Sequence, residues 1–473
     1  MTELVHTPLA RWAHEFPQRC AIACGNTRIS FAQLHHTLTT RAQQLQHAPA
    51  TCLVDDTQDT LHQLIEFLSI VYSGRCAAVS DPDWPAHVRQ TVVSALPQNS
   101  LTARATQSTD AFYIGFTSGS TGVPKGFQRH HQSWVESFRV CADTFGLDSH
   151  AAILAPGRIS HSLFLFGMLM GLWSGAGVAV QSQFSASHTL ATLQTGEPPC
   201  LVAVPSQLLM LLQWAQHRQL APIASVRWVL ISGARWMRQH TEALQALFPN
   251  ARLIEFYGAS ETSFIAWKDA TEPAAPDAVG RPFANVDIDI RPTSPNSTQG
   301  LIYVRSPMLF MNYVGPQHDA TAAVRDGDWL SVGDLGYRNA QGHVCLSGRQ
   351  NRMIVTQGKN LFPEELEQLL TTHPHIAQAS VHALPDPLRG ARVVAVLQWQ
   401  ENAPAPKRPT ARALQTWLRT RIESYKMPRH VYVCAAWPLT ASGKTDHARL
   451  HQAVLDTLDP THANASICLH SLS

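Results

Sequence analysis

The chain has 473 residues, more than one hydrophobic core usually organises, so we expect two or more domains. Its 36 basic side chains nearly balance 34 acidic ones, and the net charge of +2 excludes the basic surface of a nucleic-acid-binding protein and a polybasic membrane patch. A composition of 45% hydrophobic and 15% charged residues predicts a globular protein with large buried cores.

No targeting or membrane segment is expected. The first residues carry charges and no apolar run of signal-peptide length. The most apolar stretch, Leu163–Val180, is interrupted by glycines, which favours a buried helix and strand over a membrane span. The 9 cysteines form no CxxC pair and predict reduced thiols in the cytoplasm, and the 24 histidines show no metal-ligand spacing.

The first 300 residues alternate strand-like and helical patterns. Arg28–Leu34 predicts a strand entering a helix, and Leu61–Tyr72 predicts an apolar helix. Four short β-rich runs follow between helical stretches: Phe112–Phe116, Leu201–Val204, Trp228–Ile231 and Leu253–Phe256. This alternation predicts parallel α/β layers, and each run ends in a Gly-, Ser- or Pro-bearing turn, where α/β enzymes place ligands.

Residues 280–347 change character and predict a small β subdomain. Its closely spaced strands are Val286–Ile290, Leu301–Arg305 and His343–Leu346. The fold class we expect is therefore α/β, with a large N-terminal domain of layered sheets over residues 1–348 that includes this subdomain.

The remaining residues, 349–473, predict a smaller α+β C-terminal domain. We expect strands there between two helices, Pro363–Thr371 and Ala411–Tyr425, with the Pro- and Ala-rich segment Glu401–Thr410 as a loop.

The strongest chemical signal is the run YIGFTSGSTGVPKG over Tyr113–Gly126. Glycines let backbone N–H groups approach a polyanion, hydroxyls donate to its oxygens, and Lys125 adds positive charge, so the loop suits a triphosphate. Val123 occupies the position where a Walker A loop needs lysine, and a flexible linker would not follow a strand or end in Pro-Lys-Gly. The expected ATP ligands are Thr117, Ser118, Gly119, Ser120, Thr121, Gly122 and Lys125.

This run resembles the phosphate-loop signature of the adenylate-forming superfamily, which includes acyl-CoA synthetases, luciferases and peptide-synthetase adenylation domains. Further segments resemble the superfamily's motifs in the same order over most of the chain. The resemblance is nearest to the AMP-forming acyl-CoA synthetases. It implies an ATP-dependent ligase that makes an acyl-AMP and then an acyl thioester, using ATP, Mg²⁺ and CoA.

The segment EFYGASET over Glu255–Thr262 resembles the superfamily's YGxTE motif. The resemblance implies that Tyr257 stacks on adenine, that Gly258 and Ser260 also contact ATP, and that Glu261 holds Mg²⁺. A carboxylate suits this hard cation, which offsets charge as pyrophosphate leaves.

Two further segments complete the expected nucleotide site. Ser232–Arg235 lies where the adenine-lining turn sits, so Gly233 is expected to contact ATP, whereas Arg235 departs from the pattern and its role stays open. In WLSVGD the resemblance implies that Asp334 binds the ribose hydroxyls, and that Arg349 contacts ribose or phosphate.

The C-terminal motif PLTASGKT over Pro438–Thr445 implies a catalytic lysine, Lys444, which reaches the active site during adenylation and stabilises charge in the transition state. Gly348–Glu367 resembles the interdomain hinge. Asn351 aligns with the hinge position, where many members carry Asp or Lys, and implies a mobile C-terminal domain.

The segment Ile159–Gly167 resembles ligases of fatty or other non-amino acids more than amino-acid adenylation domains. His161 stands near the position where the latter carry an Asp, and we expect it to border the substrate carboxylate as a catalytic residue. Trp134, Phe164 and Phe166 either line an acyl pocket or are plain core. An apolar acid, fatty or aryl, is favoured.

The tail after Lys444 is too short for a carrier domain, so a standalone enzyme is expected. CoA is the favoured acceptor, and the phosphopantetheine of a carrier protein is the rival. A luciferase-like oxygenase shares every motif and stays open. An inactive nucleotide-binding regulator is disfavoured because Lys125, Glu261, Asp334, Arg349 and Lys444 are all present.

Overall fold

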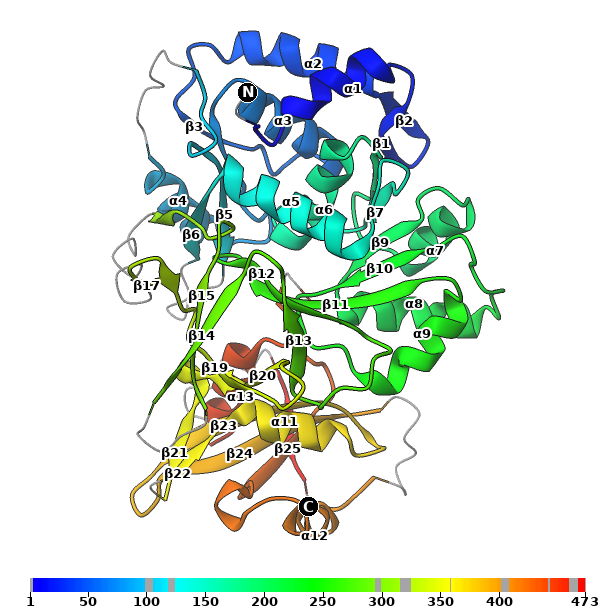
Figure 1. Cartoon of the computed structure of the whole chain (residues 1–473). Coiled ribbons are helices and arrows are strands. Elements are labelled where there is room, and N and C mark those ends of the chain that lie inside the picture. The colour runs from blue at the N-terminus through cyan, green and yellow to red at the C-terminus, as the bar shows by residue number, and fades with distance from the viewer. Residues whose placement is uncertain are drawn as a thin grey trace. The chain divides into compact units, whose positions relative to one another are not determined.

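The computed structural model divides the chain into two compact units (Figure 1). It describes residues 3–97, 105–117, 124–293, 299–314, 325–357, 359–400, 408–440, 443–458 and 467–472. The first unit comprises Met1–Asp289, Tyr303–Val332 and Asn339–Val344, and the second comprises Ile290–Ile302, Gly333–Arg338 and Cys345–Ser473. The expected division between residues 348 and 349 stays a prediction.

The larger sheet of the first unit has the strand order β13-β12-β11-β10-β9-β7-β8-β1-β2. Its strands are β1 (Cys20–Cys24), β2 (Thr27–Ser30), β7 (Ile153–Ala155), β8 (Val178–Val180), β9 (Cys200–Ala203), β10 (Trp228–Ile231), β11 (Arg252–Ala259), β12 (Ser263–Asp269) and β13 (Ala278–Pro282). The strands from β11 to β1 run parallel, whereas β2, β12 and β13 pair antiparallel at the edges. Three of the predicted β-rich runs are confirmed as β9, β10 and β11: Leu201–Val204, Trp228–Ile231 and Leu253–Phe256.

Helices cover both faces of this sheet. On one face lie α7 (Ala186–Gln194), α8 (Pro205–His217) and α9 (Thr241–Leu247), and Figure 1 shows α8 and α9 beside β10 and β11. On the other lie α5 (His131–Phe145) and α6 (Ser162–Trp173). In β9, Leu201 and Ala203 join the core beneath α7–α9, while Val202 approaches Gly167 of α6. Burial on both faces explains why β9 and β10 are continuously apolar.

The apolar stretch Leu163–Val180 forms α6 and β8, as predicted. Across the part of the chain that the structure describes, no helix has both the length and the apolar character needed to cross a membrane.

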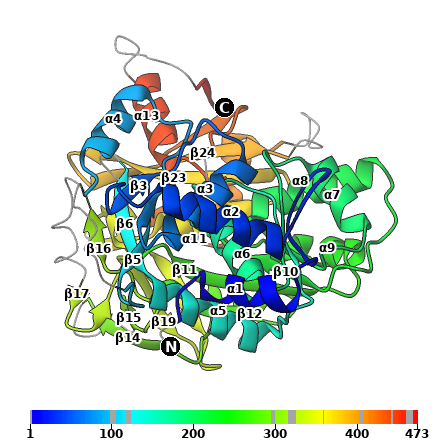
Figure 2. The same cartoon turned by 90° about the horizontal axis from the view of Figure 1, so that it is seen from above.

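A second sheet of the first unit has the order β16-β6-β5-β4-β3. Its strands are β3 (Thr51–Leu53), β4 (Cys76–Ala78), β5 (Ala111–Thr117), β6 (Lys125–His130) and β16 (Asn312–Val314). Helix α3 (Thr60–Tyr72) contacts β4, α2 (Phe31–Gln44) packs on α3, and α1 (Thr7–Glu15) packs on α2. Figure 2 shows these three helices next to one another, and α4 (Ala86–Ser94) follows β4 in the chain. The predicted strand-to-helix segment at Arg28–Leu34 and the predicted helix at Leu61–Tyr72 are confirmed.

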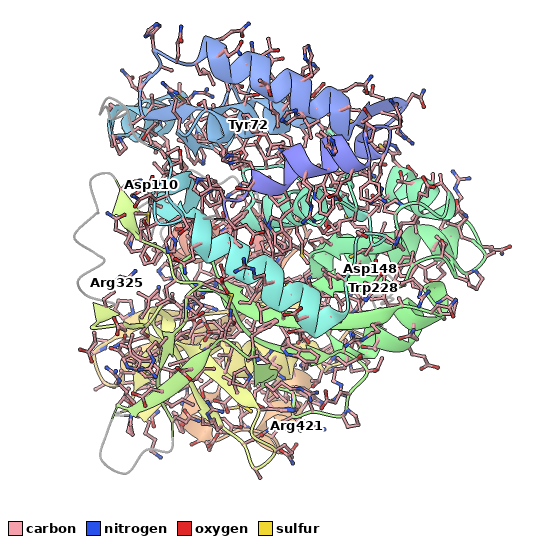
Figure 3. The ribbon with its side chains drawn as sticks, turned by 45° about the horizontal axis from the view of Figure 1, so that its top comes forward. Tyr72, Asp110, Asp148, Trp228, Arg325 and Arg421 are labelled. Carbon is pink, nitrogen blue, oxygen red and sulfur yellow. The ribbon has the colours of Figure 1, made fainter. Side chains whose placement is uncertain are left out.

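Aromatic side chains connect this sheet to α5 and α6. The Trp134 ring of α5 lies 5.4 Å from Tyr113 of β5 and 5.7 Å from Phe166 of α6, and Phe166 lies 4.7 Å from Phe264 of β12. The far end of α5 is tied to β10, because the Trp228 indole N–H donates to the Phe145 carbonyl at 2.9 Å. Trp228 lies beside Asp148 just past that helix end in Figure 3.

The predicted β-rich region is also confirmed. The described residues from 280 to 349 form strands joined by turns: β14 (Asp287–Pro292), β15 (Gly300–Arg305), β17 (Arg325–Asp326), β18 (Trp329–Leu330), β19 (Asp334–Arg338) and β20 (Val344–Arg349), in addition to β16.

The second unit contains the predicted α+β domain. A hairpin, β21 (Ile354–Thr356) with β22 (Lys359–Leu361), precedes a sheet of β23 (Ile376–Asp386), β24 (Gly390–Trp399), β25 (His430–Cys434) and β26 (Leu469–Ser471). Its helices are α11 (Pro363–Thr371), α12 (Ala411–Arg419) and α13 (His447–Leu458). Alternate residues of β24 face different cores: Val393 and Ala395 pack with α11 and α12, whereas Val394 and Val396 pack with α13.

The predicted helix Ala411–Tyr425 is too long. Helix α12 ends at Arg419, and Ser424–Lys426 form a separate 3₁₀ turn. That turn lets the nearly buried Lys426 ammonium reach Glu365 at 2.7 Å and Glu423 at 3.0 Å. The ion pairs of the buried Lys426 ammonium outweigh the helical propensity of the residues that follow Arg419.

Buried histidines lie where α5 begins. His131 is 1% exposed, its ring stacks on Phe112 at 5.0 Å, and its Nδ1 accepts the Val5 N–H at 3.3 Å. Burial lowers the pKa of His131 to about 3, with nearby His6 acting in the same direction. Burial likewise lowers the pKa of His6 and of His130 to about 4.

We expect acid to destabilise the first unit through this cluster. An unfolded histidine binds a proton near pH 6.5, so between pH 6.5 and 4 protons favour the unfolded chain. The stabilisation is fully present above pH 6.5 and is lost as the pH falls, on the order of 3 kcal/mol for His131. Chemical denaturation at pH 7.5 and pH 5 should show a smaller pH dependence in His131→Phe than in the wild type. The matched change at exposed His36 should leave it unaltered, and equal slopes in all three proteins would contradict this expectation.

Candidate active site

The predicted ligand residues of the first unit follow strands that end at one edge of the larger sheet. The parallel register pairs Ile231 with Glu255 and Ala203 with Ile231, so the carboxyl ends of β9, β10 and β11 lie side by side. Gly233 follows β10, and Tyr257 lies in the last part of β11. Loops at the carboxyl ends of parallel strands are where open α/β sheets bind ligands.

The loop with Gly233 is held rigidly against β11. Gly233 has φ +89°, and a Cβ there would lie 3.0 Å from the Val204 side chain, so the turn requires glycine. The Ser232 hydroxyl donates to Phe256 O at 2.9 Å, and the Glu255 carboxylate accepts the Trp236 N–H at 3.0 Å.

Glu255 is itself fixed by a buried ion pair. Its carboxylate lies 3.1 Å from the Lys268 ammonium, with both side chains under 10% exposed. Arg235 lies on the same loop and approaches Asp277 O at 3.5 Å, which does not assign it a role in ligand binding.

A tight turn carries Ser260 and Glu261 between β11 and β12. The Ala259 N–H donates to the Thr262 hydroxyl at 3.1 Å, and the Thr262 N–H returns a bond to Ala259 O at 3.2 Å. A Cβ on Gly258 would lie 1.9 Å from Ser263 O, so Gly258 is needed for the strands to approach this closely. The turn therefore holds Ser260 and Glu261 in a defined place.

Glu261 is positioned from its side chain and its backbone. The Tyr313 hydroxyl donates to Glu261 Oε1 at 2.9 Å, and the Phe310 N–H donates to Glu261 O at 2.7 Å. Burial, reinforced by the Glu261 charge, raises the pKa of Tyr313, so its hydroxyl stays a donor. The Arg325 guanidinium, labelled in Figure 3, donates to Phe310 O and braces this segment.

Tyr313 also contacts the phosphate-loop lysine. The Lys125 ammonium lies 5.5 Å from the centre of the Tyr313 ring. Sequence reasoning did not identify Tyr313, since 52 residues separate it from Glu261. Only the pairing of β16 with β6, which sets Tyr313 opposite Phe127, brings it here.

The predicted phosphate loop connects two paired strands. Thr117 at the end of β5 and Lys125 at the start of β6 face each other in the antiparallel ladder. Ser118, Gly119, Ser120, Thr121 and Gly122 lie outside the described residues. The two ends of the loop are thus held together, with Lys125 directed toward Tyr313.

His161 immediately precedes α6, and its neighbourhood joins the turn of Ser260. The Ser162 and Ser260 hydroxyl oxygens are 3.3 Å apart. On the other side, the Ser160 hydroxyl donates to Asp81 at 3.2 Å, and the Arg158 guanidinium lies 3.4 Å from the same carboxylate. Asp81 is an acidic neighbour that sequence reasoning missed, because it lies 79 residues away in the chain.

The three candidate pocket aromatics have different surroundings. Trp134 and Phe166 are 3% and 7% exposed, and their rings contact each other, which favours a role in the hydrophobic core over a role in lining an acyl pocket. Phe164 lies 5.1 Å from the His161 ring and packs over Gly157, where a Cβ would lie 2.1 Å from the Phe164 ring. Phe164 alone therefore lies beside the candidate catalytic histidine.

In the second unit, Asp334 and Arg349 form an ion pair. Arg349 Nε lies 3.0 Å from Asp334 Oδ1, and the Gln350 N–H donates to Gly333 O at 2.8 Å. The Asp334 side chain is 6% exposed and the Arg349 side chain 54%. The structure thus brings these neighbours on β19 and β20 together, and their roles at the ribose and phosphate stay predictions.

The predicted hinge residue Asn351 is exposed in the 3₁₀ turn Gln350–Arg352. The next residue, Arg352, is anchored instead: its guanidinium lies 2.9 Å from Glu364 and 2.5 Å from Glu367 of α11. In this turn the Arg352 side chain is thus held by ion pairs to α11, whereas Asn351 is exposed to solvent.

Lys444 is exposed in a braced turn before α13. Thr440 N–H donates to Lys444 O at 2.7 Å, and the Lys444 N–H donates to the Thr440 hydroxyl at 3.2 Å. Gly443 has φ +77°, and the Trp437 indole bonds to the Thr445 hydroxyl at 3.1 Å. The exposed Lys444 thus lies on a turn that is braced by backbone bonds and by the Trp437–Thr445 contact.

Sequence families match both units. Residues 29–314 match the AMP-binding enzyme family, and residues 365–444 match the AMP-binding enzyme C-terminal domain. The uncharacterized acyl--CoA ligase YhfT of Bacillus subtilis is 36% identical over 345 residues, covering 72% of this chain and 68% of that protein. The putative long chain fatty acid-CoA ligase VraA of Staphylococcus epidermidis is 28% identical over 398 residues, covering 80% and 83%.

Solved structures share the fold. The o-succinylbenzoate CoA synthetase MenE of Bacillus subtilis, in complex with its acyl-adenylate intermediate, superposes with a TM-score of 0.80 at 21% identity, covering 95% of this chain and 98% of that one. ATP-bound MatB of Rhodopseudomonas palustris gives a TM-score of 0.83 at 19% identity, covering 97% and 100%. The expected α/β fold class with a smaller α+β C-terminal domain is confirmed.

Proposed function

Because this chain belongs to the AMP-binding enzyme family, we propose that it activates an apolar carboxylic acid, fatty or aryl, with ATP and transfers the acyl group to CoA. It is an AMP-forming acid–thiol ligase that makes an acyl adenylate and then an acyl thioester. The observation that carries the proposal is that Tyr313 links the end of the phosphate loop to the turn after β11: its ring faces the Lys125 ammonium, and its hydroxyl donates to the Glu261 carboxylate.

The first step joins the acid to AMP. A carboxylate oxygen attacks the α-phosphorus of ATP, the bond from that phosphorus to the bridging oxygen breaks, and pyrophosphate leaves with its electron pair. We assign Lys125, Thr117 and the loop between them to the phosphates, and Gly233, Tyr257, Gly258 and Ser260 to the adenosine. Asp334 and Arg349 are assigned to the ribose and phosphate, and Lys444 to the reacting carboxylate and α-phosphate.

Magnesium fits the donor set at Glu261. A carboxylate has lone pairs on two oxygens, and the Tyr313 hydroxyl uses only part of this capacity on Oε1. Hard cations prefer such oxygen ligands, and Mg²⁺ would supply positive charge for the departing pyrophosphate. We assign the metal to Glu261.

The second step forms the thioester. The thiolate sulfur attacks the acyl carbon, the bond from that carbon to the phosphate oxygen breaks, and AMP leaves. We propose that the second unit moves about the turn at Asn351 between the two steps, which takes Lys444 away and admits the thiol. We propose that the enzyme works in the cytoplasm, where both ATP and CoA are supplied.

The acid site favours a substrate without an ammonium group. Asp81 is the acidic side chain brought next to the His161 segment, and its carboxylate already lies 3.4 Å from the Arg158 guanidinium. An ammonium ion buried here would lack a dedicated counter-charge, at a cost of several kcal/mol. The relative named for long-chain fatty acids supports an apolar acid. The relative named for 2-succinylbenzoate, an aryl acid that carries a second carboxylate, leaves the length and the substituents of the acid open.

ATP–pyrophosphate exchange with a panel of acids tests this function. We expect exchange that depends on Mg²⁺ and on a fatty or aryl acid, with AMP and pyrophosphate as products and CoA as acyl acceptor. Free α-amino acids should support at least ten-fold slower exchange. Release of ADP, or preferential exchange with an amino acid, would contradict the proposal.

The same purified protein separates the acceptor alternatives. Acyl transfer to a phosphopantetheinylated carrier protein with none to CoA would replace CoA by the carrier. Oxygen-dependent light emission from the acyl adenylate would instead indicate the luciferase-like reading.

A further inference from the structure

Arg129 is a cation inside the protein core of the first unit. It lies on β6, four residues after Lys125, and is 1% exposed. Burial lowers the pKa of its guanidinium to about 9, against the opposing effect of the Glu261 charge, so it is still charged at neutral pH. A buried charge is costly unless its donors are all used, which makes the identity of its partners informative.

The partners of Arg129 surround Glu261. Arg129 Nη1 donates to Ser260 O at 2.7 Å, and Nη2 donates to the Ser263 hydroxyl at 2.6 Å, so one guanidinium holds both sides of the turn that bears Glu261. Nη2 also donates to Met308 O at 2.6 Å. Met308 lies two residues before Phe310, whose N–H donates to Glu261 O.

The Nε donor points to a different element. Arg129 Nε lies 3.2 Å from the Ser133 hydroxyl in the first turn of α5. All of these acceptors are neutral oxygens, so the positive charge near Glu261 is not cancelled by a direct ion pair within this set. A lysine could not reproduce this arrangement, because its three donors all leave one nitrogen, whereas the guanidinium spreads its donors over three nitrogens in one plane.

We infer that Arg129 is a positioning residue for Glu261, which holds the Ser260–Ser263 turn and the Met308–Phe310 segment so that the carboxylate is preset to receive the Mg²⁺ of Mg·ATP. The inference rests on the proposed metal role of Glu261. It predicts that loss of Arg129 weakens the magnesium-dependent part of nucleotide binding, in addition to any effect on stability. If Arg129 had only a structural role, its loss would lower the melting temperature without changing the magnesium dependence of nucleotide binding.

Calorimetric titration with ATP, without acid, separates these roles. Each protein is titrated in excess Mg²⁺ and again in EDTA. For Arg129→Lys we expect at least ten-fold weaker binding of Mg·ATP and a higher half-saturating Mg²⁺ concentration, with metal-free ATP binding within two-fold of the wild type. Ser133→Ala, which removes the acceptor on α5 together with the bond from the Ser133 hydroxyl to His130 O and leaves the contacts around Glu261, is the matched control and should bind Mg·ATP normally. Its affinity shows whether the loss of any one guanidinium contact is enough to weaken Mg·ATP binding.

Wild-type Mg·ATP affinity in Arg129→Lys, or equal loss with and without Mg²⁺, would overturn the inference. If the lysine variant does not fold, Ser263→Ala decides, because it removes one contact to the turn and keeps the buried charge. It should then weaken Mg·ATP binding several-fold and leave metal-free binding unchanged, and an unchanged Mg·ATP affinity would overturn the inference. Glu261→Gln distinguishes failure of the metal role of Glu261 from failure of its positioning by Arg129. If this variant also leaves the Mg²⁺ dependence of binding unaltered, the metal role of Glu261 fails. If it changes that dependence, only the positioning by Arg129 fails.

Discussion

Replacing Lys444 by alanine is expected to slow adenylate formation roughly a hundred- to thousand-fold, the equivalent of about 3–4 kcal/mol for one charge-assisted contact in the transition state. Thioester formation from a supplied acyl adenylate and CoA should keep most of its rate, because the proposed domain movement takes Lys444 away before the thiol attacks. The fold should survive, since Thr440, Trp437 and Thr445 brace the turn through contacts that alanine at 444 keeps.

Both half-reactions are measured on the same preparation, by pyrophosphate release and by thioester formation, together with the melting temperature. Arg449→Ala removes another exposed positive charge from the same unit and is the matched control. Equal damage to both half-reactions at an unchanged melting temperature would contradict the assignment of Lys444 to one step and the domain movement on which it depends.

Replacing Glu261 by glutamine is expected to lower the adenylation rate by roughly a hundred-fold, about 2.7 kcal/mol. The amide keeps the size of the side chain and an oxygen that can accept the Tyr313 hydroxyl, so the turn should be preserved while the charge offered to Mg²⁺ is lost. The half-saturating Mg²⁺ concentration in pyrophosphate exchange should rise in parallel.

Tyr313→Phe provides the graded comparison, because it removes the bond to Glu261 Oε1 and leaves the carboxylate charge. Its loss of rate should be smaller than that of Glu261→Gln. Glu272→Gln, at a carboxylate that pairs with Arg281, is the control for loss of an acidic side chain elsewhere in the unit. A Glu261→Gln enzyme with normal rate and normal Mg²⁺ dependence would remove the metal from this residue.

The sequence by itself determined the features that depend on local chemistry. Strands β9 and β10 were predictable because parallel strands buried on both faces are continuously apolar, and β11 because its run Leu253–Phe256 is apolar except at Glu255. Helix α11 begins and ends where its sequence predicts, since Pro363 occupies a first-turn position that tolerates proline. The order of Lys125, Glu261, Asp334 and Lys444 was likewise readable, because each lies in a short motif with its own glycines.

Tertiary structure alone decided which of these residues have partners far away in the chain. Arg129, Tyr313 and Asp81 lie in no recognisable motif, and they reach the site through strand pairing and loop packing across 52 to 134 residues. The same packing placed Trp134 and Phe166 in the aromatic core and ended α12 at Arg419 so that Lys426 could be neutralised. Burial and register are properties of the assembled sheet, so a pattern within one segment does not specify them.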